Sequence, residues 1–230
     1  MASAHEPGEV AWVEVPGGRL AVEMIRSGTE PVLAIHGISS QRKLWNWLRA
    51  AAPDLGLIAP DLRGRGDSVG VTLPSSIGRH AADMVLVLNN LGLEAVHVCG
   101  MSKFFTRTAP LLDPDDPLLL DYLAHDLFGP LVRLDADALM ADAADIFFGS
   151  SKWRQLQVPV RLLTAEWSTG ADSAPAYPAD AVQSFRDALD VLVTVRPVPG
   201  VDHAASIMTM TGARATADLI AEALAPETLA

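Results

Sequence analysis

An apolar segment that ends in Gly100-Met101-Ser102 constrains the fold of this chain more than any other feature. Residues 95–99 before it have the character of a β-strand, and the residues after it can form a helix. A serine at a sharp strand-to-helix turn is typical of a nucleophile elbow, which has glycine two residues before and two residues after the serine. Gly100 fills the first of these positions, but Phe104 occupies the second. The pattern therefore predicts a nucleophile at Ser102 on an elbow that departs from the usual form.

Length, charge and cysteine content narrow the classes of protein. The chain has 230 residues, half of them hydrophobic, which favours one domain with a sizeable core. Acidic residues outnumber basic ones 28 to 17, and a formal charge of −11 argues against nucleic acid or an anionic membrane as partner. The single cysteine, Cys99, allows no internal disulfide and is compatible with a reducing compartment, so we expect a cytoplasmic protein. We expect neither a secretory signal in Met1–Pro16 nor a membrane-spanning run.

Strand-like and helix-like patterns alternate along most of the chain. The expected strands are 9–15, 19–25, 32–35, 57–59, 95–99, 159–164 and 191–195, and the expected helices are 44–52, 77–91 and 213–224. Apolar strands that alternate with helices indicate an α/β fold with a mostly parallel sheet covered by helices on both faces. Ligands of such sheets bind beyond the carboxyl ends of the strands.

Residues 111–157 break this alternation. Acidic turns at 113–117 are followed by two stretches with helical apolar spacing, one of them through Leu118, Tyr122 and Leu123. We therefore expect a helical lid inserted between two sheet strands. One domain would then consist of an N-terminal part of the core at 1–110, the lid at 111–157 and a C-terminal part of the core at 158–230.

Four motifs give the chain a resemblance to a known family. They are His36-Gly37-Ile38 with the downstream Trp45, Asp61-Leu62-Arg63-Gly64-Arg65-Gly66-Asp67-Ser68, Gly100-Met101-Ser102, and Gly200-Val201-Asp202-His203. In this order and spacing, from about Pro31 to the C-terminus, they resemble the α/β-hydrolase-fold family. The resemblance implies an α/β-hydrolase-type sheet, although a fold alone does not fix a function.

The chain departs from the family directly after the elbow. The family has a long elbow helix and a further strand before the lid, and residues 103–112 are too few to hold both. We therefore expect a truncated helix and a missing strand, as after an internal deletion. We also expect strand 159–164 to lie directly beside strand 95–99, because a gap would leave two rows of backbone groups unpaired in a buried sheet.

The resemblance assigns roles to the polar residues. A serine hydroxyl needs a base, an acid that orients the base, and hydrogen-bond donors for the oxyanion. Ser102 would be the nucleophile and His203, on a turn after the last strand, the base. The backbone N–H groups of Ile38 and Lys103 would bind the oxyanion.

The acid stays open between two carboxylates. Both follow strand 159–164, where the family carries its acid. Asp172 is the first choice because it lies out on the loop, and Glu166, at the end of the strand, is the second. Each can also be a solvated carboxylate with no part in the chemistry.

Together these residues predict a serine hydrolase without cofactor or metal. Its substrate would be a small, fairly apolar ester, a lactone, or a carbon–carbon bond adjacent to a carbonyl. Three aromatic residues near the motif loops, Trp45, Phe104 and Trp167, are candidates to line the pocket. Cys99 would be an inert apolar side chain. The alternative is a catalytically impaired or non-catalytic protein of this fold that binds a small molecule. Three features favour it: Phe104 at the second glycine position of the elbow, the missing strand and the open choice of acid.

Overall fold

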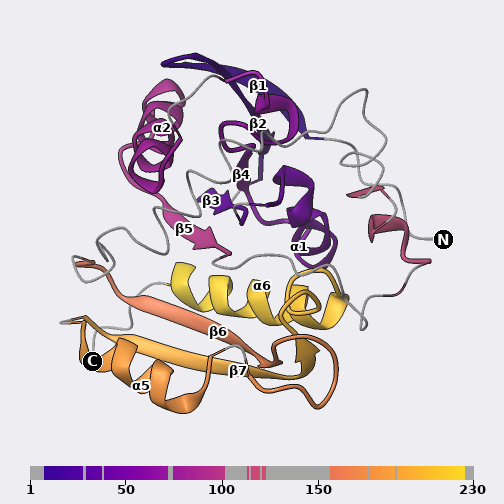
Figure 1. Ribbon diagram of the computed structural model, residues 1–230. Coiled ribbons are helices and arrows are strands. Elements are labelled where there is room, and N and C mark those ends of the chain that lie inside the picture. The colour runs from indigo at the N-terminus through magenta and orange to yellow at the C-terminus, as the bar shows by residue number, and fades with distance from the viewer. Residues whose placement is uncertain are drawn as a thin grey trace.

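Two β-sheets with helices around them make up the structure (Figure 1). The computed structural model describes residues 8–27, 30–37, 39–71, 75–101, 113, 115–119, 121–122, 156–175, 177–189 and 191–225. Figure 1 shows α6 (Met210–Leu224) between the larger sheet and the smaller one.

The larger sheet has five strands in the order β1-β2-β4-β3-β5. These strands are β1 (Glu9–Val15), β2 (Gly18–Ile25), β3 (Val32–Ile35), β4 (Leu57–Pro60) and β5 (His97–Gly100). Strand β2 is antiparallel to both β1 and β4, whereas β3 is parallel to β4 and β5. Four strands therefore point the same way and β2 alone runs against them, which confirms the prediction of a mostly parallel sheet.

The hairpin β1–β2 follows from its turn residues and its alternation. Val15 pairs with Gly18, which leaves Pro16 and Gly17 as a two-residue connection. Gly17 has a φ of 97°, a value that L side chains rarely adopt and that a turn with proline followed by glycine requires. Val13 and Val15 point into the core, and Glu14 between them faces out.

Helices cover both faces of the larger sheet. The helical elements of the first half are η1 (Arg42–Trp45), α1 (Asn46–Ala51), η2 (Gly66–Ser68) and α2 (Ile77–Asn90). Leu33 and Ile58 pack with Met84 and Val87 of α2 in one core cluster. The neighbouring residues Val32, Ala34, Leu57 and Ala59 pack on the other face, with Trp45, Leu48 and the partly buried Ile207, Ala217, Ile220 and Leu224. Alternate residues of β3 and β4 thus serve opposite faces of the sheet.

The smaller sheet pairs β6 (Val160–Trp167) in parallel with β7 (Val193–Asp202). Within the part of the chain that the structure describes, β5 is the edge strand of the larger sheet and β6 pairs with β7, so the predicted pairing of strand 159–164 with strand 95–99 is wrong. Its premise was a buried gap, but Val98 is 62% exposed and Val158 is 60% exposed. Solvent can therefore hydrate the backbone groups at these two edges. The predicted missing strand falls on residues outside the described ranges.

Most expected elements are present with shifted ends. The hairpin and strand 32–35 are confirmed, and helix 44–52 consists of η1 followed by α1. Helix α5 (Ala179–Asp187) was not expected, because its residues are more polar on average than those of α2 and α6, and none of them is buried. Of the predicted lid, residues 113, 115–119, 121–122 and 156–157 are described, and among them 117–119 and 121–122 are helical. The rest of the lid stays a prediction. Within the described ranges, every helix falls short of the length and apolar character needed to cross a bilayer.

Candidate active site

His36 links the end of β3 to the loop after β4. The imidazole is 1% exposed, and its Nε2 accepts a hydrogen bond from the backbone N–H of Leu62 at 3.0 Å. Because Nε2 is an acceptor, Nδ1 carries the proton and donates to the carbonyl of Gly37 at 2.7 Å. Burial lowers the pKa of His36 to about 3, so the ring is neutral near pH 7 and keeps both bonds. His36 is thus a structural residue of this turn.

The turn that follows spans residues 37–40. The backbone N–H of Ser40 donates to the carbonyl of Gly37 at 3.0 Å. The Gly37 carbonyl therefore accepts one bond from His36 and one from Ser40. Ile38 lies outside the described residues, and its role as an oxyanion donor stays a prediction.

The loop after β4 is held by the buried carboxylate of Asp61. This side chain is 0% exposed and accepts hydrogen bonds from the backbone N–H groups of Arg42, at 2.7 Å, and Asp67, at 2.9 Å, and from the Arg42 guanidinium. Gly66 has a φ of 50°, and a Cβ there would overlap the Asp61 carboxylate. The motif 61–68 therefore connects the end of β4 to η1 through hydrogen bonds, and both elements lie next to the His36 turn.

The end of β5 lies beside the end of β3. The two strands pair from Val32 and His97 to Ile35 and Gly100, and the N–H of Met101 donates to the carbonyl of Ile35 at 3.1 Å. The ladder thus continues to the residue that precedes Ser102. Three predicted site residues, Ser102, Lys103 and Phe104, lie outside the described residues.

His203 follows directly on the end of β7 and is held there by Asp202. The Asp202 side chain is 1% exposed and accepts from the N–H of Ala205 at 2.8 Å, which closes the turn around His203. Its other oxygen accepts from the N–H of Gly170, also at 2.8 Å, on the loop after β6. Asp202 therefore fixes the histidine turn against the loop that carries the predicted acid.

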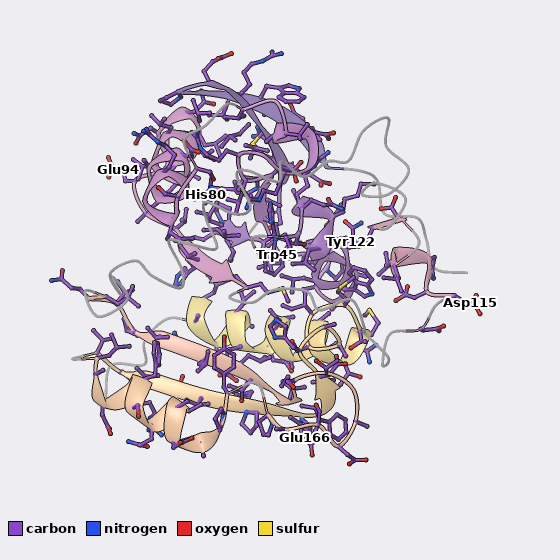
Figure 2. All side chains as sticks on the ribbon, in the orientation of Figure 1. Trp45, His80, Glu94, Asp115, Tyr122 and Glu166 are labelled. Carbon is purple, nitrogen blue, oxygen red and sulfur yellow. The ribbon has the colours of Figure 1, made fainter. Side chains whose placement is uncertain are left out.

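The two candidate acids have different surroundings. Asp172 is exposed and has a φ of 64°, a backbone conformation that aspartate tolerates better than most residues. Glu166 is exposed near the end of β6 (Figure 2), and its Oε2 accepts from the N–H of Gly200 at 2.7 Å. The register of β6 and β7 shifts at this point, and Gly200 has a φ of 73°, so Glu166 braces a β-bulge three residues before His203.

A cavity of about 850 Å³ lies between β5 and β6 over α6. His203, the predicted base, and Met101, the residue before the predicted nucleophile, both line it. Aliphatic side chains from all three elements form much of its wall, among them Val96, Val98, Leu162, Leu163, Leu219 and Ile220.

Comparison with known proteins agrees with this architecture. No family model matches the chain. A hydrolase from Pseudomonas aeruginosa aligns with a TM-score of 0.69 at 12% identity, over 93% of this chain and 98% of its own. An N-acyl homoserine lactonase aligns at 0.68 with 17% identity over 96% and 98% of the chains, and a thermophilic esterase from Thermogutta terrifontis at 0.65 with 14% identity over 95% and 100%. The chain has the α/β-hydrolase fold.

One curated relative of this α/β-hydrolase-fold chain is similar in sequence. It is lipase LipV from Mycobacterium tuberculosis, which is 34% identical over 120 residues, 50% of this chain and 45% of the lipase. The chain thus spans under half the length of this relative, and the activity of the relative is not carried over by the match itself.

Within this α/β-hydrolase fold, the predicted pocket aromatics lie in different places. Trp45 is 1% exposed and packs in the core cluster of η1, α1 and β3, and it is not among the residues that line the cavity. Trp167 is partly buried at the end of β6, opposite Asp202 in the strand register. Cys99 lines the cavity, and burial raises the pKa of its thiol to about 12, so it stays protonated and unreactive at neutral pH.

Two features of the site were missed by sequence reasoning. One is the role of the Asp202 side chain, which the sequence analysis named only as part of the histidine-turn motif, although an aspartate three residues before a turn N–H is a recognisable side-chain-to-backbone motif. The other is the packing of residues 115–119 and 121–122 on η1 and α1, through Leu119 and Tyr122. Its contacts depend on residues about 80 positions apart, such as Ser40 and Tyr122, and no local pattern reports them.

Proposed function

We propose that this chain is a cofactor-independent α/β-fold hydrolase with a serine nucleophile. Its substrate would be a small, fairly apolar ester or lactone, or a molecule with a carbon–carbon bond next to a carbonyl. The observation that carries the proposal is the placement of His203, which is fixed by Asp202 and lines the same cavity as Met101. The partial similarity to a lipase, and the shared fold with an esterase and a lactonase, support the same reaction class.

In the proposed reaction, His203 removes the proton of the Ser102 hydroxyl while Oγ attacks the substrate carbonyl carbon. The backbone N–H groups of Ile38 and Lys103 bind the resulting oxyanion. The imidazolium then protonates the leaving alkoxide, and an acyl-serine remains. Water, deprotonated by His203, attacks this ester, releases the carboxylic acid and restores Ser102.

The cavity supports a substrate with an apolar body. Its volume of about 850 Å³ falls within the usual range for small-molecule sites, and aliphatic side chains form much of its wall beside polar ones such as Arg161, Tyr177 and Glu222. Of the two candidate acids, we propose Asp172 as the partner of His203. The Glu166 carboxylate already accepts the N–H of Gly200, and it serves to brace the bulge.

Hydrolysis of 4-nitrophenyl butyrate, together with labelling by a fluorophosphonate, tests the proposal. The wild-type protein should hydrolyse the ester and be labelled, and Ser102→Ala should lose both because no other hydroxyl replaces the nucleophile. Thr194→Ala is the matched control. Thr194 is exposed on β7, and eight residues, or about 26 Å of strand, separate it from the Asp202 turn. Equal ester hydrolysis by wild type and Ser102→Ala would remove the serine from the mechanism.

The acid is tested in the same assay. Asp172→Asn should lower kcat by up to about 10⁴-fold, as neutralisation of the triad acid does in a serine protease, and Glu166→Gln should have a much smaller effect. The reverse order would make Glu166 the acid. If the folded wild-type protein is neither labelled nor active, the alternative of a non-catalytic protein that binds a small molecule is favoured.

A further inference from the structure

The turn 37–40 is fixed at both of its ends. At its start, His36 donates to the Gly37 carbonyl at 2.7 Å. At its end, the Ser40 hydroxyl lies 3.0 Å from the hydroxyl of Tyr122, and the two side chains are 3% and 5% exposed. The next residue is tied to the same place, because the Gln41 side-chain amide donates to the Tyr122 carbonyl at 3.4 Å. One tyrosine thus contacts two consecutive residues at the end of this turn.

Tyr122 is itself held firmly by its surroundings. Its ring packs against Trp47, with centroids 6.2 Å apart and an angle of 57° between the planes (Figure 2 labels Tyr122 next to α1). The indole N–H of Trp47 donates to the carboxylate of Asp116 at 2.8 Å, on the same segment as Tyr122. Farther out, the exposed Lys43 ammonium pairs with Asp121 at 2.9 Å. The segment is therefore anchored on η1 and α1 independently of the Tyr122 hydroxyl.

We propose that Tyr122 is a positioning residue for catalysis, whose hydroxyl holds the 37–40 turn through Ser40 so that the backbone N–H at position 38 is ready for the oxyanion. The inference rests on the proposed function. A backbone donor is effective only when its direction is fixed before the charge develops. The hydrogen bond from Ser40 N to the Gly37 carbonyl closes the turn, and the bond between the two hydroxyls immobilises Ser40. A segment predicted as part of the lid would thereby be coupled to the rate of the chemical step.

The test is a double-mutant cycle with Tyr122→Phe and Ser40→Ala in the hydrolysis of 4-nitrophenyl butyrate. Tyr122→Phe keeps the ring against Trp47 and removes the hydroxyl. Each single variant should lower kcat about 10-fold or more with KM nearly unchanged, because the donor acts on the transition state. The double variant should be no slower than the worse single one, since both remove the same bond. Ser40→Thr, which restores a hydroxyl, should recover most of kcat.

Lys43→Ala is the matched control, because it removes a contact of the same segment and leaves both hydroxyls in place. Its kcat should equal that of wild type. If kcat of Lys43→Ala falls as far as that of Tyr122→Phe, docking of the segment alone matters and the proposal is overturned. An unchanged kcat in Tyr122→Phe overturns it as well. Amide hydrogen exchange at Ser40 separates this inference from the proposed function. Exchange should be faster in Tyr122→Phe even if Ser102 proves to have no role. Unchanged exchange would show that the bond between the Tyr122 and Ser40 hydroxyls does not hold the turn.

Discussion

Buried polar side chains hold the loops around this site, and each is satisfied by backbone groups from another element. His36 joins β3 to the loop after β4, Asp61 joins that loop to η1, and Asp202 joins the turn after β7 to the loop after β6. A buried polar group that loses its partner costs about 1–3 kcal/mol, so these bonds fix loop positions more strictly than exposed contacts could.

The neutrality of His36 has a consequence for acid stability. Its pKa is about 3 in the folded protein and about 6.5 when unperturbed, so below pH 6.5 the unfolded chain binds a proton that the folded chain does not. As the pH is lowered from 6 to 4, protonation of His36 in the unfolded chain should therefore reduce the free energy of unfolding by about 1.4 kcal/mol per pH unit. Above pH 7, His36 should make almost no contribution to the pH dependence of stability. His36→Gln keeps an acceptor but does not titrate. Urea unfolding at several pH values should give it a shallower slope than wild type, and equal slopes would contradict the assignment.

The motifs could be recognised in the sequence because the residues of each motif are adjacent or nearly adjacent in the chain. His203 lies on a turn after a strand, as expected, and the motif at 61–68 forms a loop after β4. The partners of these motifs could not be read in this way. The bond of Ser40 to Tyr122 and that of Gly170 to Asp202 form only when distant segments meet, and hydrophobic periodicity carries no information about such pairs.

At the scale of elements, the open boundary between β5 and β6 is the main departure from expectation. Each strand alone has the predicted apolar character, and β6 pairs with β7 in parallel as neighbouring strands of such sheets do. The local pattern could not predict the separation of β5 from β6, because this separation depends on the placement of α6 and on the cavity between the two strands. Helix α5 was missed for a simpler reason, since its residues are more polar on average than those of the expected helices α2 and α6.

The open edge should be visible in amide exchange along β5. The N–H of Met101 points to β3, and because successive N–H groups alternate in direction, that of Cys99 does too. The N–H groups of Val98 and Gly100 then point towards the cavity. Hydrogen exchange followed by NMR should be fast at Val98 and Gly100 and slow at Cys99 and Met101. Equal protection of all four amides would mean that another strand pairs with this edge in solution.

For the whole molecule, α6 is the element that joins the two sheets. Ile220 and Leu224 pack against the core of the five-stranded sheet, and Ala215 packs against the cluster of β6 and β7. The first turn of α6 also packs closely against the backbone just after the histidine turn, because a Cβ at Gly212 would overlap the backbone of Ser206. The two sheets should therefore lose their structure together when α6 is loosened.

Ile220→Ala tests this coupling. Shortening the side chain should lower the free energy of unfolding by about 2 kcal/mol, the low end for an isoleucine truncation because Ile220 is only partly buried. Tryptophan fluorescence and far-UV circular dichroism should still report one coincident transition in urea. The exposed Asp218→Ala on the same helix should change stability by less than about 0.5 kcal/mol. Two separate transitions in Ile220→Ala would show that the sheets fold as independent units.

The position of α6 in the chain also sets the order of events during synthesis. The face of the first sheet that carries Val32, Ala34 and Leu57 is covered in part by Ile220 and Leu224, which leave the ribosome more than 150 residues later. Chains emerge from the N-terminal side at about 5–20 residues per second, so this apolar face waits for several seconds without its cover. A nascent chain stalled before residue 210 should accordingly bind chaperones through that face, and release of the full chain should end the binding.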